Sequence, residues 1–292
     1  MDSTDKNPIV RRGGLLFAIA ALFACTSIAN LVVISILGTG FQIESVPYST
    51  IVLLQLMSSV VSFGVAALIT SKYAFGSFRA VWGDQRPKLN LLLLAIAAIV
   101  VCQYFIEWAS MINESLCTRF GLDYIAENES IVRLMSRIIS FDGIGGWTTT
   151  IIVVGIVPAL CEELYFRGAL QLAFERTTHN PRYAIVASAL VFALMHGQTA
   201  SLIPLLLLGI LLGIVFYCTR NLLINIVIHS INNILALVMI SLSDAPIEQT
   251  LSSPTEATGA LLPILSVIAT LATVYLLMKN KRVDNSELKI EN

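Results

Sequence analysis

The sequence predicts an all-α fold: a polytopic membrane helix bundle of about eight transmembrane helices, with its functional site inside the bundle. The first observation is composition. Of 292 residues, 56% are hydrophobic and only 13% are charged, and the mean hydropathy is +0.81, whereas soluble domains carry about 25% charged residues. The second observation is a series of apolar runs of membrane-spanning length. The third is a small set of ionisable residues inside those runs.

The apolar runs define the expected spans. A transmembrane helix needs about 20 mainly apolar residues, and the first run is too long for the apolar core of a signal peptide. The fifth run is the shortest of the series. The expected spans are Leu15–Leu37, Ile51–Thr70, Leu91–Met111, Trp147–Thr177, Tyr183–Gly197, Ala200–Cys218, Leu222–Leu242 and Ala260–Met278.

The basic residues predict the orientation. With eight spans, fifteen of the 18 Lys and Arg residues fall on the side of the N-terminus, Arg167 counted among them, and the other three are Arg119, Arg133 and Arg137. Loops rich in Lys and Arg stay in the cytoplasm. We therefore expect a multi-pass protein of the cell membrane with both termini cytoplasmic. The net charge is −1, whereas a nucleic-acid-binding protein typically has an excess of basic residues, so we expect no nucleic-acid partner.

Three segments divide the chain. Residues 1–145 hold N-terminal transmembrane helices and a connecting loop, 146–242 the polar core, and 243–292 the last transmembrane helix and a cytoplasmic tail. Between Asn113 and Gly146, apolar residues at helical spacing predict a packed connecting helix, with a surface helix or a lid as alternatives. Five scattered cysteines form no metal-binding spacing, so we expect buried free thiols.

Three charged residues interrupt the fourth span. Glu162, Glu163 and Arg167 follow the charge-free run from Trp147 to Leu160. A charge at the bilayer centre costs at least about 2.5–3.5 kcal/mol. On a helix Glu163 and Arg167 are four residues apart and can pair, which predicts that exchanging their two charges restores some folding. Glu162 is about 100° away around the helix and needs another partner.

Two histidines also lie within expected spans. His196 ends the fifth span, and His229 shares a helix face with Asn233 four residues later. Measured along their helices from the cytoplasmic ends, Glu162 and His196 lie at about 21 Å, His229 at about 13 Å and Asn233 at about 19 Å. Groups that converge in this way indicate a cavity filled by water or substrate.

The chemistry of this set favours hydrolysis. A carboxylate beside a neutral imidazole can activate water as a general base, and imidazole and amide donors can stabilise an oxyanion. No serine-centred nucleophile motif is present, and Cys161 has no histidine at a local spacing. Direct attack of water on an acyl or peptide carbonyl is the chemistry that fits best.

Three motifs in order resemble those of a known family. They are Glu-Glu-x-x-x-Arg at residues 162–167, Phe-x-x-x-His at 192–196 and His-x-x-x-Asn at 229–233. The pattern resembles the CPBP family of CAAX-protease and bacteriocin-processing membrane endopeptidases, which includes the type II CAAX prenyl proteases (Rce1-like) and is also called the abortive-infection family. The resemblance covers about Gly146–Leu242.

The resemblance implies a fold, an activity and residue roles. It implies an eight-helix bundle with a cavity open to the cytoplasm, and an endopeptidase acting on a protein or peptide substrate that can be lipidated. Glu162 and His196 would activate the water, and His229 and Asn233 would support the oxyanion. The supporting residues would be Glu163, Arg167 and Phe192.

Two alternatives stay open. Zinc normally takes three protein ligands, and Glu162, His196 and His229 would just suffice. However, each comes from a different helix, and the amide of Asn233 fits oxyanion support better than a metal site. We therefore expect no cofactor and no metal. The second alternative is a non-catalytic membrane immunity or binding protein, or a peptide transporter, with the same polar centre; no inverted repeat supports a transporter.

Overall fold

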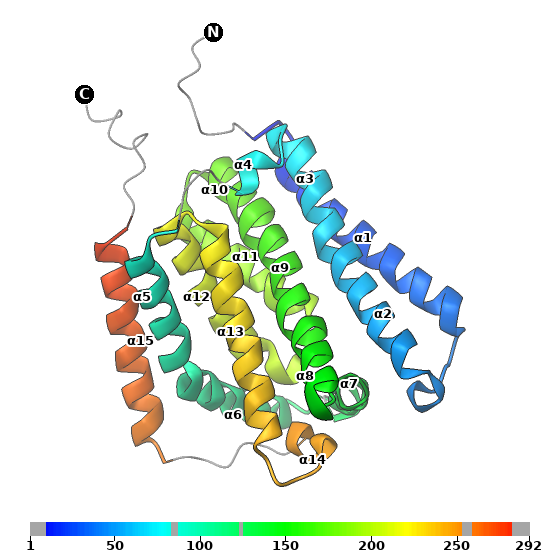
Figure 1. The fold of residues 1–292 in the computed structure, drawn as a ribbon. Coiled ribbons are helices and arrows are strands. Elements are labelled where there is room, and N and C mark those ends of the chain that lie inside the picture. The colour runs from blue at the N-terminus through cyan, green and yellow to red at the C-terminus, as the bar shows by residue number, and fades with distance from the viewer. Residues whose placement is uncertain (1–9, 83–86, 123–124, 253–258, 282–292) are drawn as a thin grey trace, which may run out of the picture.

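The computed structural model describes residues 10–82, 87–122, 125–252 and 259–281 (Figure 1). Within these ranges every regular element is a helix and no strand occurs. The five cysteines are buried and free, as expected. Four of the basic residues counted above, as well as parts of the 243–258 loop and of the C-terminal segment, lie outside the described ranges. These residues are Lys6, Arg86, Arg282 and Lys289.

The N-terminal helices form one flank of the bundle. The long α1 packs along α3 and the wider-wound segment η2, and η2 in turn contacts the central helix α9 (Figure 1). Large apolar side chains on the outward face of α1 stay exposed, as expected for a lipid-facing helix. The elements are α1 (Gly14–Leu37), η1 (Ile43–Ser45), α2 (Tyr48–Ser59), η2 (Val60–Val65), α3 (Ala66–Phe75) and α4 (Arg79–Trp82), while α9 is Val157–Glu163.

The third expected span is not one straight helix. It consists of α5 (Leu89–Val101) and α6 (Gln103–Arg119), which are bent by 40° at Cys102. The side-chain amide of Gln103 donates to the carbonyl oxygen of Ile99 at 2.7 Å. That carbonyl would otherwise accept the backbone N–H of Gln103, and a side chain that enters the helical ladder in this way is a known cause of kinks.

The segment that follows α6 contains a packed helix, α7 (Ile125–Ile138). Ile138 is fully buried and belongs to a small apolar cluster with Val46, Ile51 and Val153. The connecting helix expected between residues 113 and 146 is therefore present and packs against η1, α2 and α14.

The second half of the chain surrounds one central helix from Gly143 to Thr178 (Figure 1). It contains two segments of wider, π-type winding, η3 and η4, on either side of α9. Helices α11, α12 and α13 pack against it in succession. The elements are α8 (Gly143–Thr150), η3 (Ile151–Ile156), η4 (Leu164–Gln171), α10 (Leu172–Thr178), α11 (Pro181–Met195), η5 (Thr199–Ser201), α12 (Leu202–Thr219), α13 (Leu222–Ser241), α14 (Ile247–Ser252) and α15 (Leu261–Lys279).

Asparagine caps set the starts of α11 and α13. The side-chain oxygen of Asn180 accepts from the backbone N–H groups of Arg182 and Tyr183, and that of Asn221 accepts from Ile224. Such caps satisfy N–H groups that have no partner inside the helix. Asn180 and Asn221 therefore fix the residue at which each helix begins, and with it the height of His196 and His229.

The number of membrane-length helices is lower than expected. Among the described residues six helices are long and apolar enough to cross a membrane, or seven if the bent pair α5 and α6 is one span. The expected fifth span is the 15-residue α11, which is shorter than a usual crossing. The count of eight is thus not confirmed. The start of α1 and the end of α15 nevertheless lie at the same end of the bundle (Figure 1).

This arrangement leads to a topology prediction. We expect reporter fusions within residues 71–90 and after Met278 to report a cytoplasmic location, because the basic residues gather at that end. Fusions within residues 38–50 or 243–258 are expected to report the outside. A cytoplasmic signal from the 243–258 loop would contradict the prediction, since α13 and α15 would then not both cross the membrane.

Candidate active site

The candidate site lies halfway along the central helix. The π-type segments η3 and η4 flank α9, and such segments are rare overall but frequent at functional sites. Pro158, which has no backbone N–H to donate, lies in the first turn of α9, directly after the π-type winding of η3. Glu162 and Glu163 end α9 and are only 8% and 0% exposed. Two carboxylates are therefore buried side by side in the interior of the bundle.

Glu163 is the centre of the polar cluster. Its Oε1 accepts from Arg167 and contacts Nδ1 of His229, each at 2.8 Å. Its Oε2 accepts from the side-chain amide of Asn225 at 3.2 Å. The predicted pairing of Glu163 with Arg167 is thus present, and two further partners from α13 complete the carboxylate. A buried charge needs partners of this kind to offset its desolvation.

Arg167 is held by α11 and α12 as well as by Glu163. One guanidinium nitrogen donates to the carbonyl of Gly209 at 3.2 Å, and the guanidinium lies 4.9 Å from the ring centroid of Phe192. A side chain at position 209 would meet the Cβ of Ala189 at 3.0 Å. The glycine therefore allows α12 to approach α11 closely, as small residues do in membrane bundles, and brings a backbone carbonyl to Arg167.

His229 lies between the two glutamates. Its Nδ1 is 2.8 Å from Oε1 of Glu163, and its Nε2 is 3.8 Å from Oε2 of Glu162. Because Arg167 holds Glu163 as a carboxylate that can only accept, Nδ1 of His229 carries the proton. Nε2 is then directed at Glu162. His229 is 3% exposed, so this geometry is fixed by the bundle and not by solvent.

His196 approaches the cluster through Phe192. The Phe192 ring lies 4.6 Å from that of His196 and 5.9 Å from that of His229, measured between centroids. Nδ1 of His196 donates to the carbonyl of Phe192 at 2.8 Å, because a carbonyl can only accept. Nε2 of His196 then carries the lone pair of the ring and can accept a hydrogen bond or a proton. The described contacts of His196 include no hydrogen bond or ion pair with Glu162, so a water between them would have to provide the link.

Asn233 contacts the central helix before α9. Its amide nitrogen donates to the carbonyl of Gly155 at 3.2 Å and lies 3.5 Å from that of Val154. Asn233 is therefore anchored on the π-type segment η3, about one turn of α13 beyond His229.

One residue of the cluster was missed by the sequence reasoning. Asn225 is fully buried, and its amide nitrogen donates both to Glu163 and to the carbonyl of Leu212 at 2.8 Å. The signal was present, because Asn225, His229 and Asn233 recur every four residues and so share one face of α13. A polar face within an apolar helix marks the side that meets the site.

The candidate zinc ligands are only partly brought together. Across the described ranges, no group of three or more His, Cys, Asp or Glu side chains is gathered closely enough to hold a metal ion. Nε2 of His229 lies 3.8 Å from Glu162, whereas His196 contacts the ring of Phe192, which in turn contacts the ring of His229. The absence of a metal stays a prediction.

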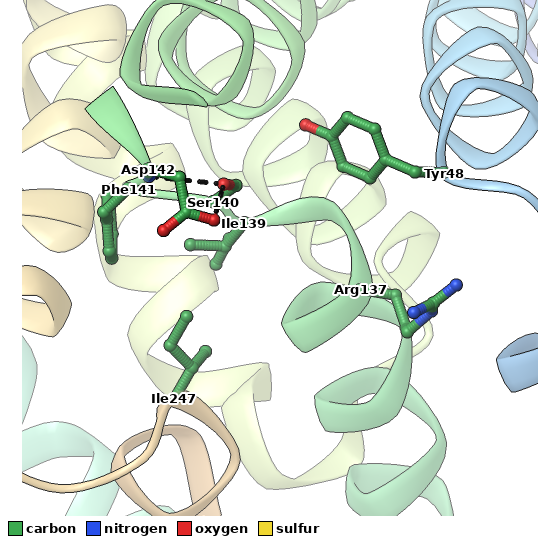
Figure 2. A pocket seen from close by; sticks show the side chains of 7 residues that line it. All are labelled: Tyr48, Arg137, Ile139, Ser140, Phe141, Asp142 and Ile247. Carbon is green, nitrogen blue, oxygen red and sulfur yellow. Dashed lines mark hydrogen bonds between the residues drawn. The ribbon is translucent and has the colours of Figure 1, made fainter. Parts of the chain in front are cut away.

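A separate pocket of about 550 Å³ lies at the end of the bundle where α2 and α8 begin. Figure 2 shows the ring of Tyr48 directed towards Ser140, which bonds Asp142, while the guanidinium of Arg137 points away. Asp142 precedes Glu162 by 20 residues, or about 30 Å along a helix, so this pocket is distinct from the candidate site. Its lining consists of Tyr48, Arg137, Ile139, Ser140, Phe141, Asp142 and Ile247.

Comparison with known families is consistent with the site. Residues 145–235 match the family model described as type II CAAX prenyl endopeptidase Rce1-like. The match runs from α8 into α13 and includes all three motifs. It confirms the resemblance on which the motif analysis was based, and it supports a CAAX-type membrane protease at the level of the family. Comparison with curated proteins found no match, and neither did comparison with solved structures.

Proposed function

We propose that this chain, whose residues 145–235 are Rce1-like, is an intramembrane endopeptidase. It would hydrolyse a peptide bond of a membrane-associated protein or peptide with a water activated by Glu162 and His196. The observation that carries the proposal is the placement of Glu162: it is buried, it is not taken by Arg167, and it faces Nε2 of His229 at 3.8 Å. A buried carboxylate left free of the arginine beside it is suited to accept a proton.

The residues around Glu162 supply a balanced hydrolytic step. Glu162 takes a proton from water while the water oxygen bonds to the carbonyl carbon of the scissile peptide. The proton then passes to the peptide nitrogen, the C–N bond breaks, and a carboxylic acid and an amine leave. His196, whose Nδ1 is committed to the carbonyl of Phe192, presents Nε2 to the same water as a second acceptor.

His229 and Asn233 would stabilise the oxyanion. With an N–H on both ring nitrogens, His229 satisfies Glu163 at Nδ1 and keeps Nε2–H for the developing negative charge. In that form the charges of Glu162, Glu163, Arg167 and His229 sum to zero, which suits a cluster away from water. Donors fixed in advance towards a developing charge are among the largest contributions to catalysis.

Cleavage of a peptide library by purified protein in detergent tests the proposal. We expect mass spectrometry to reveal one class of cut peptide, and no cuts with Glu162→Ala protein of equal folded yield. Libraries with and without a C-terminal lipid determine whether the substrate is lipidated. If wild-type protein cuts nothing, or if Glu162→Ala cuts equally well, the protease proposal is wrong and a binding or immunity protein becomes the better account.

The proposal includes a prediction about metal. We expect protein washed with chelator to keep its activity, because the candidate ligands Glu162, His196 and His229 come from three helices and do not form a close cluster among the described residues. Elemental analysis of the active, washed protein is the measurement. One equivalent of zinc per chain, with activity lost on its removal and regained on its return, would make these residues ligands instead.

A further inference from the structure

A line of side-chain amides leads from α6 to Asn233. The amide nitrogen of Gln103 donates to Oδ1 of Asn232 at 3.1 Å, and the amide nitrogen of Asn232 donates to Oδ1 of Asn233 at 3.4 Å. Asn233 in turn donates to the carbonyl of Gly155 at 3.2 Å. We call Gln103, Asn232 and Asn233 the amide relay. It joins the kink between α5 and α6 to the π-type segment of the central helix.

The two ends of the amide relay fix its direction. Gln103 also donates to the carbonyl of Ile99 at 2.7 Å, and at the other end Asn233 meets the carbonyl of Gly155. Backbone carbonyls only accept, so both end amides must present nitrogen to them. With both N–H groups of Gln103 committed, Asn232 must turn its oxygen to Gln103 and its nitrogen to Asn233. Rotating any one of these amides by 180° would place two N–H groups, or two oxygens, opposite each other.

From this geometry we infer that Gln103 and Asn232 are positioning residues for the reaction, acting through Asn233. The inference rests on the proposed function, in which Asn233 donates to the oxyanion. The amide relay holds the oxygen of Asn233 away from the substrate and its nitrogen towards η3. One N–H of Asn233 is used by Gly155, and the contact with Val154 is 3.5 Å, at the long limit of a hydrogen bond. This longer contact with Val154 is the one that a substrate oxygen would replace.

The inference extends the site beyond the matched region. Gln103 lies outside residues 145–235, on a helix that the three motifs do not include. Its place in the amide relay depends on the kink at Cys102, because the same side chain that bonds Ile99 also bonds Asn232. The kink thus has a catalytic consequence: it sets the side chain that orients the oxyanion donor.

A double-mutant cycle tests the inference, with kinetics measured on the peptide that wild-type protein cuts fastest. Asn232→Leu is expected to lower kcat about 10- to 100-fold, the effect of a small misplacement of a reacting group. KM should stay nearly unchanged, since no ground-state binding is lost. Asn233→Ala should lower kcat about 100- to 1,000-fold. In the double variant, Asn232→Leu should lower kcat no further than Asn233→Ala does alone, because the Asn233 side chain that Asn232 positions is already absent.

Two further variants keep the test decisive. Gln103→Met removes the first amide of the relay, on α6, and should lower kcat by less than Asn232→Leu while leaving KM unchanged. In a protein that already carries Asn233→Ala, Gln103→Met should cause no further loss of kcat. Thr270→Val is the control: the buried hydroxyl of Thr270 on α15 donates to the carbonyl of Ser266 at 2.7 Å within its own helix, and this bond belongs neither to the kink nor to the amide relay. Its kcat should equal that of wild type even if the protein is less stable.

The possible failures can be told apart. If wild-type protein cuts the peptide and Glu162→Gln does not, the proposed function holds. In that case, the positioning role would be overturned by losses of Asn232→Leu and Asn233→Ala that multiply, by an effect on KM alone, or by a drop in kcat with Thr270→Val. If Asn232→Leu does not fold, Gln103→Met decides. Absence of wild-type cleavage would instead remove the proposed function itself.

Discussion

Replacement of Glu162 by glutamine is expected to lower kcat by at least about 100-fold, the usual contribution of a positioned general base. The amide has nearly the same shape but cannot accept a proton from water. Among the described ion pairs, Glu162 takes part in one, at 3.8 Å with His229, while Arg167 pairs with Glu163. Its replacement should therefore leave the folded yield and the thermal midpoint close to wild type. Steady-state kinetics on a cleaved peptide and a melting curve in detergent are the measurements.

Glu175 offers a matched control on the same helix. It is also a glutamate with a basic partner, Arg220, at 2.8 Å, but it lies near the end of the central helix. We expect Glu175→Gln to cost some stability and to leave kcat unchanged. If Glu162→Gln proved as poorly folded as a Glu163 variant, the division between a catalytic and a structural glutamate would be wrong.

Removal of Glu163 should have the largest effect on stability. Loss of one partner of a buried ion pair typically costs about 3–5 kcal/mol of stability. Glu163→Ala removes the carboxylate that accepts from the guanidinium of Arg167, from Nδ1 of His229 and from the amide of Asn225. Denaturation in a graded series of SDS concentrations would measure the change. A Glu163→Ala protein as stable as wild type would show that these contacts do not hold the bundle.

The structure also changes an expectation about this pair. Considered as an isolated pair, Glu163 and Arg167 predict that exchanging their charges restores folding. In the structure, an arginine at position 163 would face His229 and Asn225, which both offer donors, and a glutamate at 167 would meet the carbonyl of Gly209. We therefore expect the double exchange to be no more stable than either single variant.

The sequence predicted the helix bundle and the residues of the candidate site better than it predicted which of those residues contact each other. Apolar length predicts a span because the bilayer imposes it, and spacing by four predicts the pair of Glu163 and Arg167. Spacing cannot predict which residue of another helix meets a side chain. The contact of His229 with Glu163, and not with Glu162 alone, depends on how α9 and α13 pack.

The kink was missed because it depends on single side chains. Residues 91–111 form an unbroken run on a hydropathy scale, but the side chains of Cys102 and Gln103 both bond the carbonyl of Ile99, and there the helix bends by 40°. The assignment of catalytic roles to Glu162, His196, His229 and Asn233 remains a prediction until activity is measured.

The shortness of α11 has a consequence for the membrane beside it. Fifteen residues span about 22 Å, some 8 Å less than the hydrocarbon layer. The chain after Met195 therefore turns back below the lipid headgroups, where backbone groups need partners from the protein. Asn113 of α6 provides two of them, donating to the carbonyl of Thr199 at 2.8 Å and accepting from the N–H of Ile203 at 2.9 Å.

Local thinning of the bilayer is one way in which a membrane accommodates a short helix of this kind. Because His196 follows α11 directly, we expect any such thinning to shorten the path of water to this residue.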